Sequence, residues 1–422
     1  MSKNKRKMLT IVNVLLIIIL ITITLMYFNT QENNTEIKSS LKEYNAELEE
    51  NEHMHLEEDS SGDKVPVPNG YVGSKATGEN EIDTGYVIYE GTEEVNDENV
   101  EEAQKTRNQY VWIPVPDASQ MYGTDENGKK WGKLYDFTTD TGENIDQITG
   151  AKPLNWNESN GVFSIITKTG DVEPSISPRV VDIAIDMDSR IKKENIGAED
   201  THEFLIQLEQ EFCEMIESIE KYKGFYVGRY ETGDLSKDNS VIRKYNQDIA
   251  SQTWYTMYKK CKNLNNENAN ITTGIIWGSQ WNRVLMWLIE SENKSKEEIC
   301  KDSTSWGNYR DSEFEYTNDK EESNLKLKNS EVTIPTGGAE YTKANNIYDL
   351  AGNVSDLTMT VSNGLYKQYR GGNYQDKENS ENATAVTKMY SYQGFKYARL
   401  QSNAVYKIVY LIFIQITCFI NK

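Results

Sequence analysis

The sequence predicts an α+β fold with much irregular coil, placed after a single N-terminal transmembrane helix. In the folded part, three segments with helical apolar stripes are separated by short strand-like segments, and strictly alternating strand–helix–strand units are missing. The membrane helix is predicted because residues 8–28 carry no charged side chain. Although only 37% of the residues are apolar, the 26 Tyr and 8 Trp supply enough buriable area for a core.

The first element is the uncharged segment Met8–Phe28, which at about 1.5 Å per residue spans a hydrocarbon core of about 30 Å. A basic tip, residues 1–7, precedes it, and the chain that follows is acidic. The positive-inside rule therefore predicts a single-pass protein of the cell membrane, with a cytoplasmic N-terminus and an extracellular remainder. A cleaved signal peptide would have a shorter apolar run and a small-x-small cleavage site, which the residues before Asn29 do not offer.

Residues 29–107 are predicted to be an acidic stalk and linker. The range 31–64 has 11 acidic and 3 basic side chains, a balance typical of a solvated segment. The prolines Pro66 and Pro68, with glycines on either side, would break a helix and mark the entry into the folded region.

Three segments of the folded region, residues 108–400, are predicted to be helical. The range 200–223 opens with a capping aspartate and a glutamate three positions later, and a glycine follows its end. The ranges 251–264 and 279–291 also carry apolar residues at helical spacing. Each apolar stripe is expected to face the core rather than a cofactor.

Short strands are expected between these helices. Residues 110–116, Tyr-Val-Trp-Ile-Pro-Val-Pro, form a β-prone run closed by prolines. Residues 224–230, Gly-Phe-Tyr-Val-Gly-Arg-Tyr, alternate in character and have glycines where the backbone must bend. Helices and strands therefore mix without a regular order along the chain.

Several of these segments, in their order and spacing, resemble the formylglycine-generating enzyme or sulfatase-modifying-factor domain, a variant of the C-type lectin-like fold. The resemblance covers residues 108–400, with an insertion at about 117–223, and is to an exported, membrane-anchored clostridial-type branch of the family. The segments that carry it are residues 110–115, 224–231 and 278–281, residues 346–356 (Asn-Ile-Tyr-Asp-Leu-Ala-Gly-Asn-Val-Ser-Asp), residues 369–374 (Tyr-Arg-Gly-Gly-Asn-Tyr) and residues 394–396.

Residues 346–356 can form a calcium-binding loop. Asp349 and Asp356 are seven residues apart, and a tight turn between them can direct carboxylates and backbone carbonyls at one hard cation. The resemblance implies a calcium site made by the Asp349 and Asp356 side chains and the Gly352 and Val354 carbonyl oxygens. The family's usual Trp-Glu-Trp is Ser-Asp-Leu here, so this carboxylate is one methylene shorter and two aromatic supports are gone. The alternative is that both carboxylates cap turns.

Residues 370–372, Arg-Gly-Gly, have a structural interpretation. Glycines allow two backbone segments to approach closely, and a guanidinium such as that of Arg370 can pair with a buried carboxylate. A functional role for Arg370 is the less favoured alternative.

The sequence lacks the residues on which the oxidase chemistry of the family depends. The resembling enzymes hold copper with a pair of cysteines in the C-terminal part of the domain, and soft Cu(I) prefers thiolate ligands. Between Arg370 and Arg399 this chain has no cysteine, and its three histidines do not supply the His-rich iron site of the related sulfoxide synthases. We expect neither copper nor iron, and whether the chain is an enzyme stays open, with a non-catalytic role favoured.

Three functions remain open. The favoured one is a membrane-anchored extracellular module that binds an unidentified peptide, glycan or protein. The alternatives are a formylglycine-generating-type oxidoreductase that acts on a protein cysteine through substituted ligands, and a structural surface protein assembled through the stalk. A nucleic-acid partner is not expected, because 45 basic and 66 acidic residues give a net charge of −21, which repels phosphates.

Residues 401–422 form an atypical apolar tail beyond the region of resemblance. Its apolar run, residues 408–420, is marginal in length for a membrane span. Three explanations stay open: an altered reading-frame ending of an AT-rich gene, which is favoured, a second membrane span, or a packed element of the domain.

Overall fold

The computed structural model describes residues 48–124, 128, 130–135, 137, 142, 155–157, 162–164, 197–236, 239–246, 254–264, 267–362, 366–377, 386–387, 390–392, 406–408 and 410–414. The chain divides into two compact units, Met1–Leu48 and Glu49–Lys422. The predicted membrane helix at residues 8–28 lies outside the described residues. Within the described ranges, no helix is both long and apolar enough to cross a membrane.

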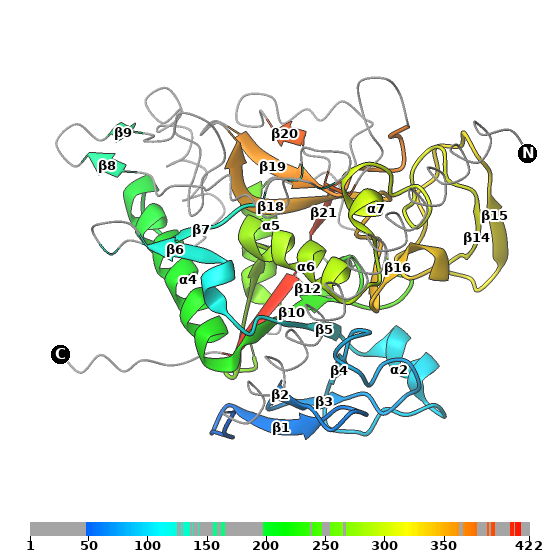
Figure 1. Cartoon of the computed structure of the whole chain (residues 1–422), viewed down its shortest axis with the longest axis horizontal. Coiled ribbons are helices and arrows are strands. Elements are labelled where there is room, and N and C mark those ends of the chain that lie inside the picture. The colour runs from blue at the N-terminus through cyan, green and yellow to red at the C-terminus, as the bar shows by residue number, and fades with distance from the viewer. Residues whose placement is uncertain are drawn as a thin grey trace, which may run out of the picture. The chain divides into compact units, whose positions relative to one another are not determined.

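The second unit is a mixed α+β structure, as expected, and its largest sheet has six strands (Figure 1). All neighbouring strands in this sheet are antiparallel. In spatial order they are β13 (Ile271–Ile275), β22 (Tyr410–Ile414), β10 (Gly224–Gly228), β5 (Gln109–Pro114), β4 (Val87–Glu90) and β3 (Tyr71–Gly73). The two predicted strands at 110–116 and 224–230 are thus confirmed and lie side by side in register.

A second sheet has four strands, of which β18 and β21 run parallel. In spatial order they are β20 (Tyr390–Tyr392), β19 (Tyr366–Arg370), β18 (Ser355–Ser362) and β21 (Tyr406–Ile408). The other described strands form hairpin-like pairs: β1 (Met54–Glu58) with β2 (Lys64–Pro68), β6 (Tyr122–Thr124) with β7 (Lys130–Gly132), β8 (Asn155–Asn157) with β9 (Val162–Ser164), β11 (Gly233–Ser236) with β12 (Asn239–Val241), β14 (Phe314–Thr317) with β15 (Ser323–Lys326), and β16 (Lys343–Ala344) with β17 (Ile347–Tyr348).

The longest described helix, α4 (Thr201–Tyr222), forms as the sequence predicts. Its first turn is capped by the Asp200 side chain, which accepts a hydrogen bond from the Glu203 backbone N–H at 2.9 Å. Lys223 ends it in the left-handed conformation, one residue before the expected glycine. The predicted apolar stripe of this helix is buried, as Phe204, Leu208, Phe212, Met215 and Ile219 all show.

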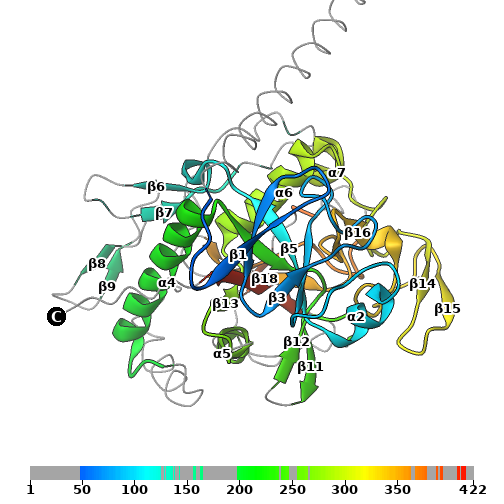
Figure 2. The same cartoon turned by 90° about the horizontal axis from the view of Figure 1, so that it is seen from below.

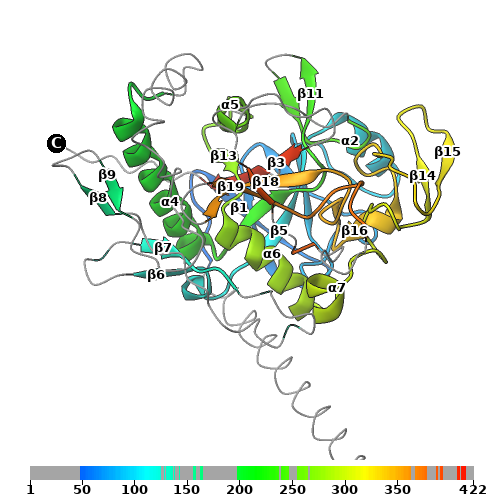
Figure 3. The ribbon, with the colours of Figure 1, turned by 90° about the horizontal axis from the view of Figure 1, so that it is seen from above.

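Four further helices are described. They are α2 (Val100–Thr106), α5 (Trp254–Asn263), α6 (Gly278–Glu290) and α7 (Lys296–Cys300), together with the 3-10 turns η1 (Ala118–Gln120) and η2 (Glu340–Thr342). The helices predicted over 251–264 and 279–291 correspond to α5 and α6. Ten residues of α6 are buried, and the helix contacts both β5 and β18, so it joins the two sheets through the core (Figure 3).

The predicted boundary between stalk and domain is wrong, because folded elements begin well before residue 108. Strands β1 to β4 and helix α2 belong to the unit that starts at Glu49, and β3 and β4 extend the large sheet (Figure 1). The acidic composition misled the prediction because several of these carboxylates are held inside the fold; Glu79, for example, is 4% exposed. Pro66 and Pro68 lie in β2, whose partner is β1 alone, and prolines are tolerated in such edge strands.

Part of the tail belongs to the domain, as in the third of the explanations given for it. Residues 410–414 form β22 inside the six-stranded sheet, where Ile412 pairs with Tyr226 of β10 and with Thr273 of β13. A central strand satisfies backbone hydrogen bonds on both sides, so this part of the tail is a packed element of the domain. The tail sequence is β-prone and apolar, which suits a strand that is paired on both edges as well as it suits a membrane span.

Candidate functional site

The predicted calcium loop begins with Asp349, whose carboxylate is fully buried and directed at a neighbouring turn. Its Oδ2 atom accepts hydrogen bonds from the Thr336 hydroxyl at 3.0 Å and from the Gly337 backbone N–H at 3.1 Å. Asp349 itself has a positive φ of 61°, a conformation that aspartate tolerates better than most residues. This carboxylate therefore caps the turn at residues 336–337.

The same loop contains a buried side chain that the sequence analysis did not single out. The Asn353 amide donates to Glu231 Oε2 at 2.8 Å and to the Ile334 carbonyl at 3.1 Å. Its oxygen accepts from the Asn308 side chain at 2.9 Å and from the Ile334 backbone N–H at 3.0 Å. The oxygen and the nitrogen of the Asn353 amide each make two hydrogen bonds, so this side chain connects the segments around residues 231, 308 and 334. In the sequence, the only indication of this role is the position of Asn353 between Gly352 and the following strand.

The glycines near this loop permit close backbone contacts, as predicted for Arg-Gly-Gly. The Gly352 N–H donates to the Gly371 carbonyl at 2.8 Å. A Cβ atom on Gly352 would lie 2.4 Å from the Asn308 carbonyl oxygen, and one on Gly371 would lie 2.6 Å from the Leu350 oxygen. Both glycines have positive φ, so a side chain is disfavoured there on two grounds.

The second predicted carboxylate ligand, Asp356, lies on β18 directly opposite Arg370 on β19. Both side chains are buried. Of the four proposed calcium donors, Asp349 caps a turn and Gly352 lies against the Asn308 backbone. Val354 directly precedes β18, and Asp356 is the second residue of that strand. No group of three or more His, Cys, Asp or Glu side chains that could hold a metal ion occurs among the residues the structure describes. The hydrogen bonds of Asp349 agree with the turn-capping alternative, and calcium binding stays a prediction.

A buried ion pair lies beside this loop and joins β10 to the N-terminal part of the domain. Arg229 Nη1 lies 2.6 Å from Glu79 Oε1, and both residues are under 5% exposed. Glu79 also accepts hydrogen bonds from Ser74, Tyr89 and Gln104. Burial works to raise the pKa of Glu79, but the Arg229 charge and the hydrogen bonds from Tyr89, Arg229 and Ser74 outweigh it and lower that pKa. The pair is a structural connection, because its groups are surrounded by protein.

The described cysteines lie on three different helices. Cys213 is on α4, Cys261 on α5 and Cys300 on α7. Cys261 and Cys300 are buried, whereas Cys213 is partly exposed. The fourth cysteine, Cys418, is outside the described residues.

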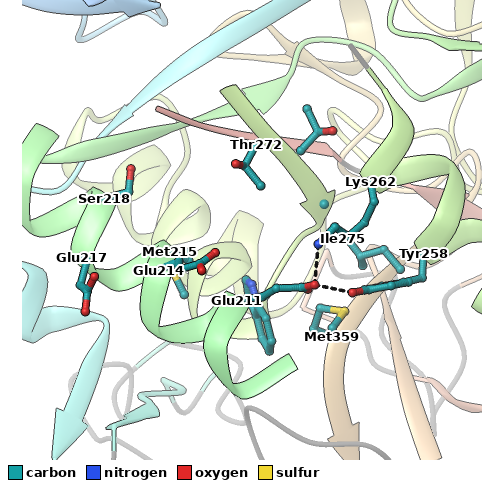
Figure 4. Close-up of a pocket in the computed structure, with 13 residues that line it drawn as sticks. Glu211, Glu214, Met215, Glu217, Ser218, Tyr258, Lys262, Thr272, Ile275 and Met359 are labelled. Atoms are coloured by element: carbon teal, nitrogen blue, oxygen red, sulfur yellow. Dashed lines mark hydrogen bonds and ion pairs between the residues drawn. The ribbon is translucent and has the colours of Figure 1, made fainter. Parts of the chain in front are cut away.

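A cavity of about 80 Å³ lies between α4, α5 and β13. Figure 4 shows its walls: carboxylates project from α4, a tyrosine and a lysine from α5, and the strand β13 closes one side. The lining consists of Glu211, Glu214, Met215, Glu217 and Ser218 from α4, Tyr258 and Lys262 from α5, Thr272, Thr273, Gly274 and Ile275 from β13, and Trp277 and Met359.

Helix periodicity places the acidic side chains of the cavity together. Positions 211, 214, 215 and 218 follow the three- and four-residue spacing of one face of α4, so two of the glutamates lie one turn apart. The sequence analysis recognised the apolar stripe of this helix but not the acidic face beside it, because the chain has 66 acidic residues and no pair stands out.

The polar centre of the cavity is a cluster of Glu211, Tyr258 and Lys262. The Tyr258 hydroxyl and the Lys262 ammonium each lie 2.5 Å from Glu211 Oε1, and Gln207 donates to the same oxygen at 3.1 Å. Gln207 also donates to the Tyr258 hydroxyl oxygen at 2.8 Å. Burial, followed by the charge of Glu211, raises the pKa of Tyr258, so the phenol stays protonated and donates to the carboxylate.

The rim of the cavity, formed by Glu214 and Glu217, is more exposed to solvent than the polar centre. Glu214 and Glu217 are exposed, and burial of part of the side chain raises the pKa of Glu214. The nearby Lys262 lowers that pKa, whereas the like charges of Glu211 and Glu217 raise it further. The net shift of the Glu214 pKa is upward, with burial as its largest cause.

Comparison with known proteins adds no relative: no protein-family model and no curated protein matches this chain. The functional argument therefore depends on the geometry described above and on the sequence motifs.

Proposed function

We propose that this chain is a membrane-anchored extracellular protein whose α+β domain binds a ligand or partner and does not catalyse a reaction. The cavity between α4, α5 and β13 carries the proposal. It combines an apolar wall, formed by Met215, Ile275, Trp277 and Met359, with a few carboxylate and hydroxyl groups. Ligand-binding sites typically have this composition, because apolar surface supplies affinity and a few polar groups supply specificity.

The membrane part of the proposal rests on the uncharged segment 8–28 and the basic residues before it. Carbonate extraction of cells that express the full chain tests it, together with protease treatment of the intact cells. We expect the chain to stay in the membrane pellet and its domain to be cut from outside. A chain released by carbonate, or a domain protected in intact cells, would contradict the proposal.

The non-catalytic part is tested against the oxidoreductase alternative. The full chain, solubilised in detergent, is incubated with Cu(I) and a cysteine-containing peptide while oxygen consumption is followed. We expect no peptide-dependent oxygen consumption, since the cysteines that the structure describes are distributed over three helices. Tight Cu(I) binding with oxidation of the peptide would establish the alternative instead.

The finer fold assignment, a formylglycine-generating-enzyme-like variant of the C-type lectin-like fold, is also a proposal. Its support is the set of motifs at residues 224–231, 346–356 and 369–374, which meet in the structure through the Glu231–Asn353 and Gly352–Gly371 hydrogen bonds. Calcium at the loop 346–356 belongs to this proposal. An experimental structure determined from crystals grown in calcium tests both points, through its chain topology and through ion density at Asp349 and Asp356.

A further inference from the structure

We propose that the cavity between α4, α5 and β13 binds an alkylammonium group, either the side chain of a peptide lysine or a free aliphatic amine. The inference rests on the proposed binding function and names the chemistry of the ligand. Three features of the described lining support it: an excess of carboxylates over cations, an ammonium group of the chain already bound there, and an apolar wall beside them.

The charges in the cavity lining are unbalanced. Among the thirteen lining residues, three carboxylates, those of Glu211, Glu214 and Glu217, stand against one cation, Lys262. The Lys262 ammonium lies 2.5 Å from Glu211 Oε1, so this pair neutralises itself. Glu214 and Glu217 leave an excess of two negative charges at the rim, which favours a positively charged ligand and opposes an anionic one.

The cavity already holds one alkylammonium group, that of Lys262. Besides the contact with Glu211, the Lys262 nitrogen lies 5.9 Å from the centre of the Tyr258 ring. A carboxylate and an aromatic face together are the groups that recognise ammonium ions in proteins. Lys262 thus shows that this surface can bind an alkylammonium group. Glu214 lies one helical turn further along α4, and the lining has no second lysine for it.

The remaining walls suit an aliphatic chain rather than a bare metal ion. Met215, Ile275 and Trp277 are buried residues of the lining and offer apolar contact to methylene groups. A hard divalent cation requires six to eight oxygen ligands, whereas no cluster of three potential metal-ligating side chains occurs among the described residues.

Isothermal titration calorimetry of the full chain in detergent at pH 7 tests the proposal. The probes are Nα-acetyl-lysine methylamide, which represents a peptide lysine, and 1,5-diaminopentane, which represents a free amine. The neutral control is the lysine probe with its ε-amino group acetylated. We expect at least one amine probe to bind at least tenfold more tightly than the neutral control, and the tighter of the two identifies the source.

Three variants separate a charge effect from a structural one. We expect Glu214→Gln to weaken binding of the amine at least fivefold, because it removes one excess charge. Lys262→Met should strengthen binding, because it removes the competing ammonium and releases the Glu211 carboxylate. The matched control is Glu315→Gln, which makes the same charge change on an exposed residue of the β14–β15 hairpin, on the side of the domain away from α4 (Figures 1 and 2).

Equal binding of the charged and neutral probes, no binding of either, or no effect of Glu214→Gln in a folded variant would overturn the alkylammonium assignment. In that case a saccharide and the neutral peptide probe are titrated into the wild-type chain and a Trp277→Ala variant. Binding of either that depends on Trp277 would leave the binding function standing while the ligand class fails. Copper-dependent peptide oxidation, in contrast, would remove the non-catalytic function itself.

Discussion

Two regions of the domain use carboxylates in opposite ways. In the buried polar region around β10, Glu79 receives four partners from the protein, namely Arg229, Ser74, Tyr89 and Gln104. In the cavity beside α4, the lining has three glutamates and one lysine, and Glu211 forms the ion pair with that lysine. The same residue type is therefore a structural connection where the fold surrounds it with donors, and a candidate ligand contact where the fold does not.

The largest effect is expected from neutralising Glu79. Glu79→Gln leaves Arg229 buried and charged without its counter-ion, which should lower the free energy of unfolding by about 3–5 kcal/mol. Urea denaturation at pH 7 measures the change, and Glu81→Gln is the control, since this glutamate is exposed two positions away. A loss as small as that of the control would mean that the buried region is no more dependent on its charges than the surface.

A smaller loss is expected at Asp349. Asp349→Ala removes the hydrogen bonds to Thr336 and Gly337 and leaves alanine at a positive φ, so unfolding should become easier by about 2–3 kcal/mol. The exposed Asp319→Ala is the control. Because these bonds need no ion, the loss should be the same in excess calcium and in chelator. A loss seen in calcium alone, with a calcium-dependent melting temperature in the wild type, would establish the metal site instead.

Glu57 is a third carboxylate that the protein surrounds with donors, and its effect depends on pH. It accepts hydrogen bonds from His55, Gly73, Lys75 and Tyr86. Burial favours a higher pKa, but the hydrogen bonds from His55 and Gly73 and the Lys75 charge outweigh it and lower the pKa of Glu57 from 4.5 to about 2. A lowered pKa gives stability that is present above pH 4.5 and is lost as the pH falls towards 2.

We expect this contribution to be about 1–2 kcal/mol, reduced by solvent screening at a side chain that is 13% exposed. Urea denaturation between pH 5 and pH 2.5 measures it as the difference between the wild type and Glu57→Gln. The neighbouring Glu58→Gln variant, at an exposed position of the same strand, should follow the wild-type curve. Identical pH dependence in all three chains would show that Glu57 is not held in its charged form.

The smallest effect has the opposite sign and concerns the cavity. Because the pKa of Glu214 is raised, its ionised form is disfavoured in the folded state, and the stability it contributes at low pH is lost as the pH rises through that pKa. Glu214→Gln should therefore stabilise the folded chain at pH 7 by a few tenths of a kcal/mol, since most of the group is open to solvent. Thermal unfolding at pH 7 and pH 4 measures this gain, which should vanish at the lower pH. A clear loss of stability at pH 7 would contradict this and show that the protein stabilises the charged form of Glu214, as it does for Glu79.

Local patterns were enough to predict the three longest described helices and two strands of the large sheet. The apolar stripe and the Asp200 cap of α4 depend on residues three or four positions apart, and the structure has both. The same holds for the glycines at 352 and 371, whose tight contacts were expected from residue type. The acidic N-terminal part was mispredicted because composition alone indicates a solvated segment. It does not show that a carboxylate such as Glu79 pairs with a distant cation, Arg229.

The sequence by itself thus determined the local elements, the uncharged segment 8–28 and the motifs of residues 346–356. Only the tertiary structure decided which charges are balanced. Asn353 meets Glu231 across 122 residues and Arg229 meets Tyr89 across 140, separations at which no local pattern indicates a contact. The tail strand β22 likewise lies between β10 and β13 because its backbone groups find partners on both sides there. Charge balance and strand pairing depend on neighbours in space, which composition and periodicity do not specify.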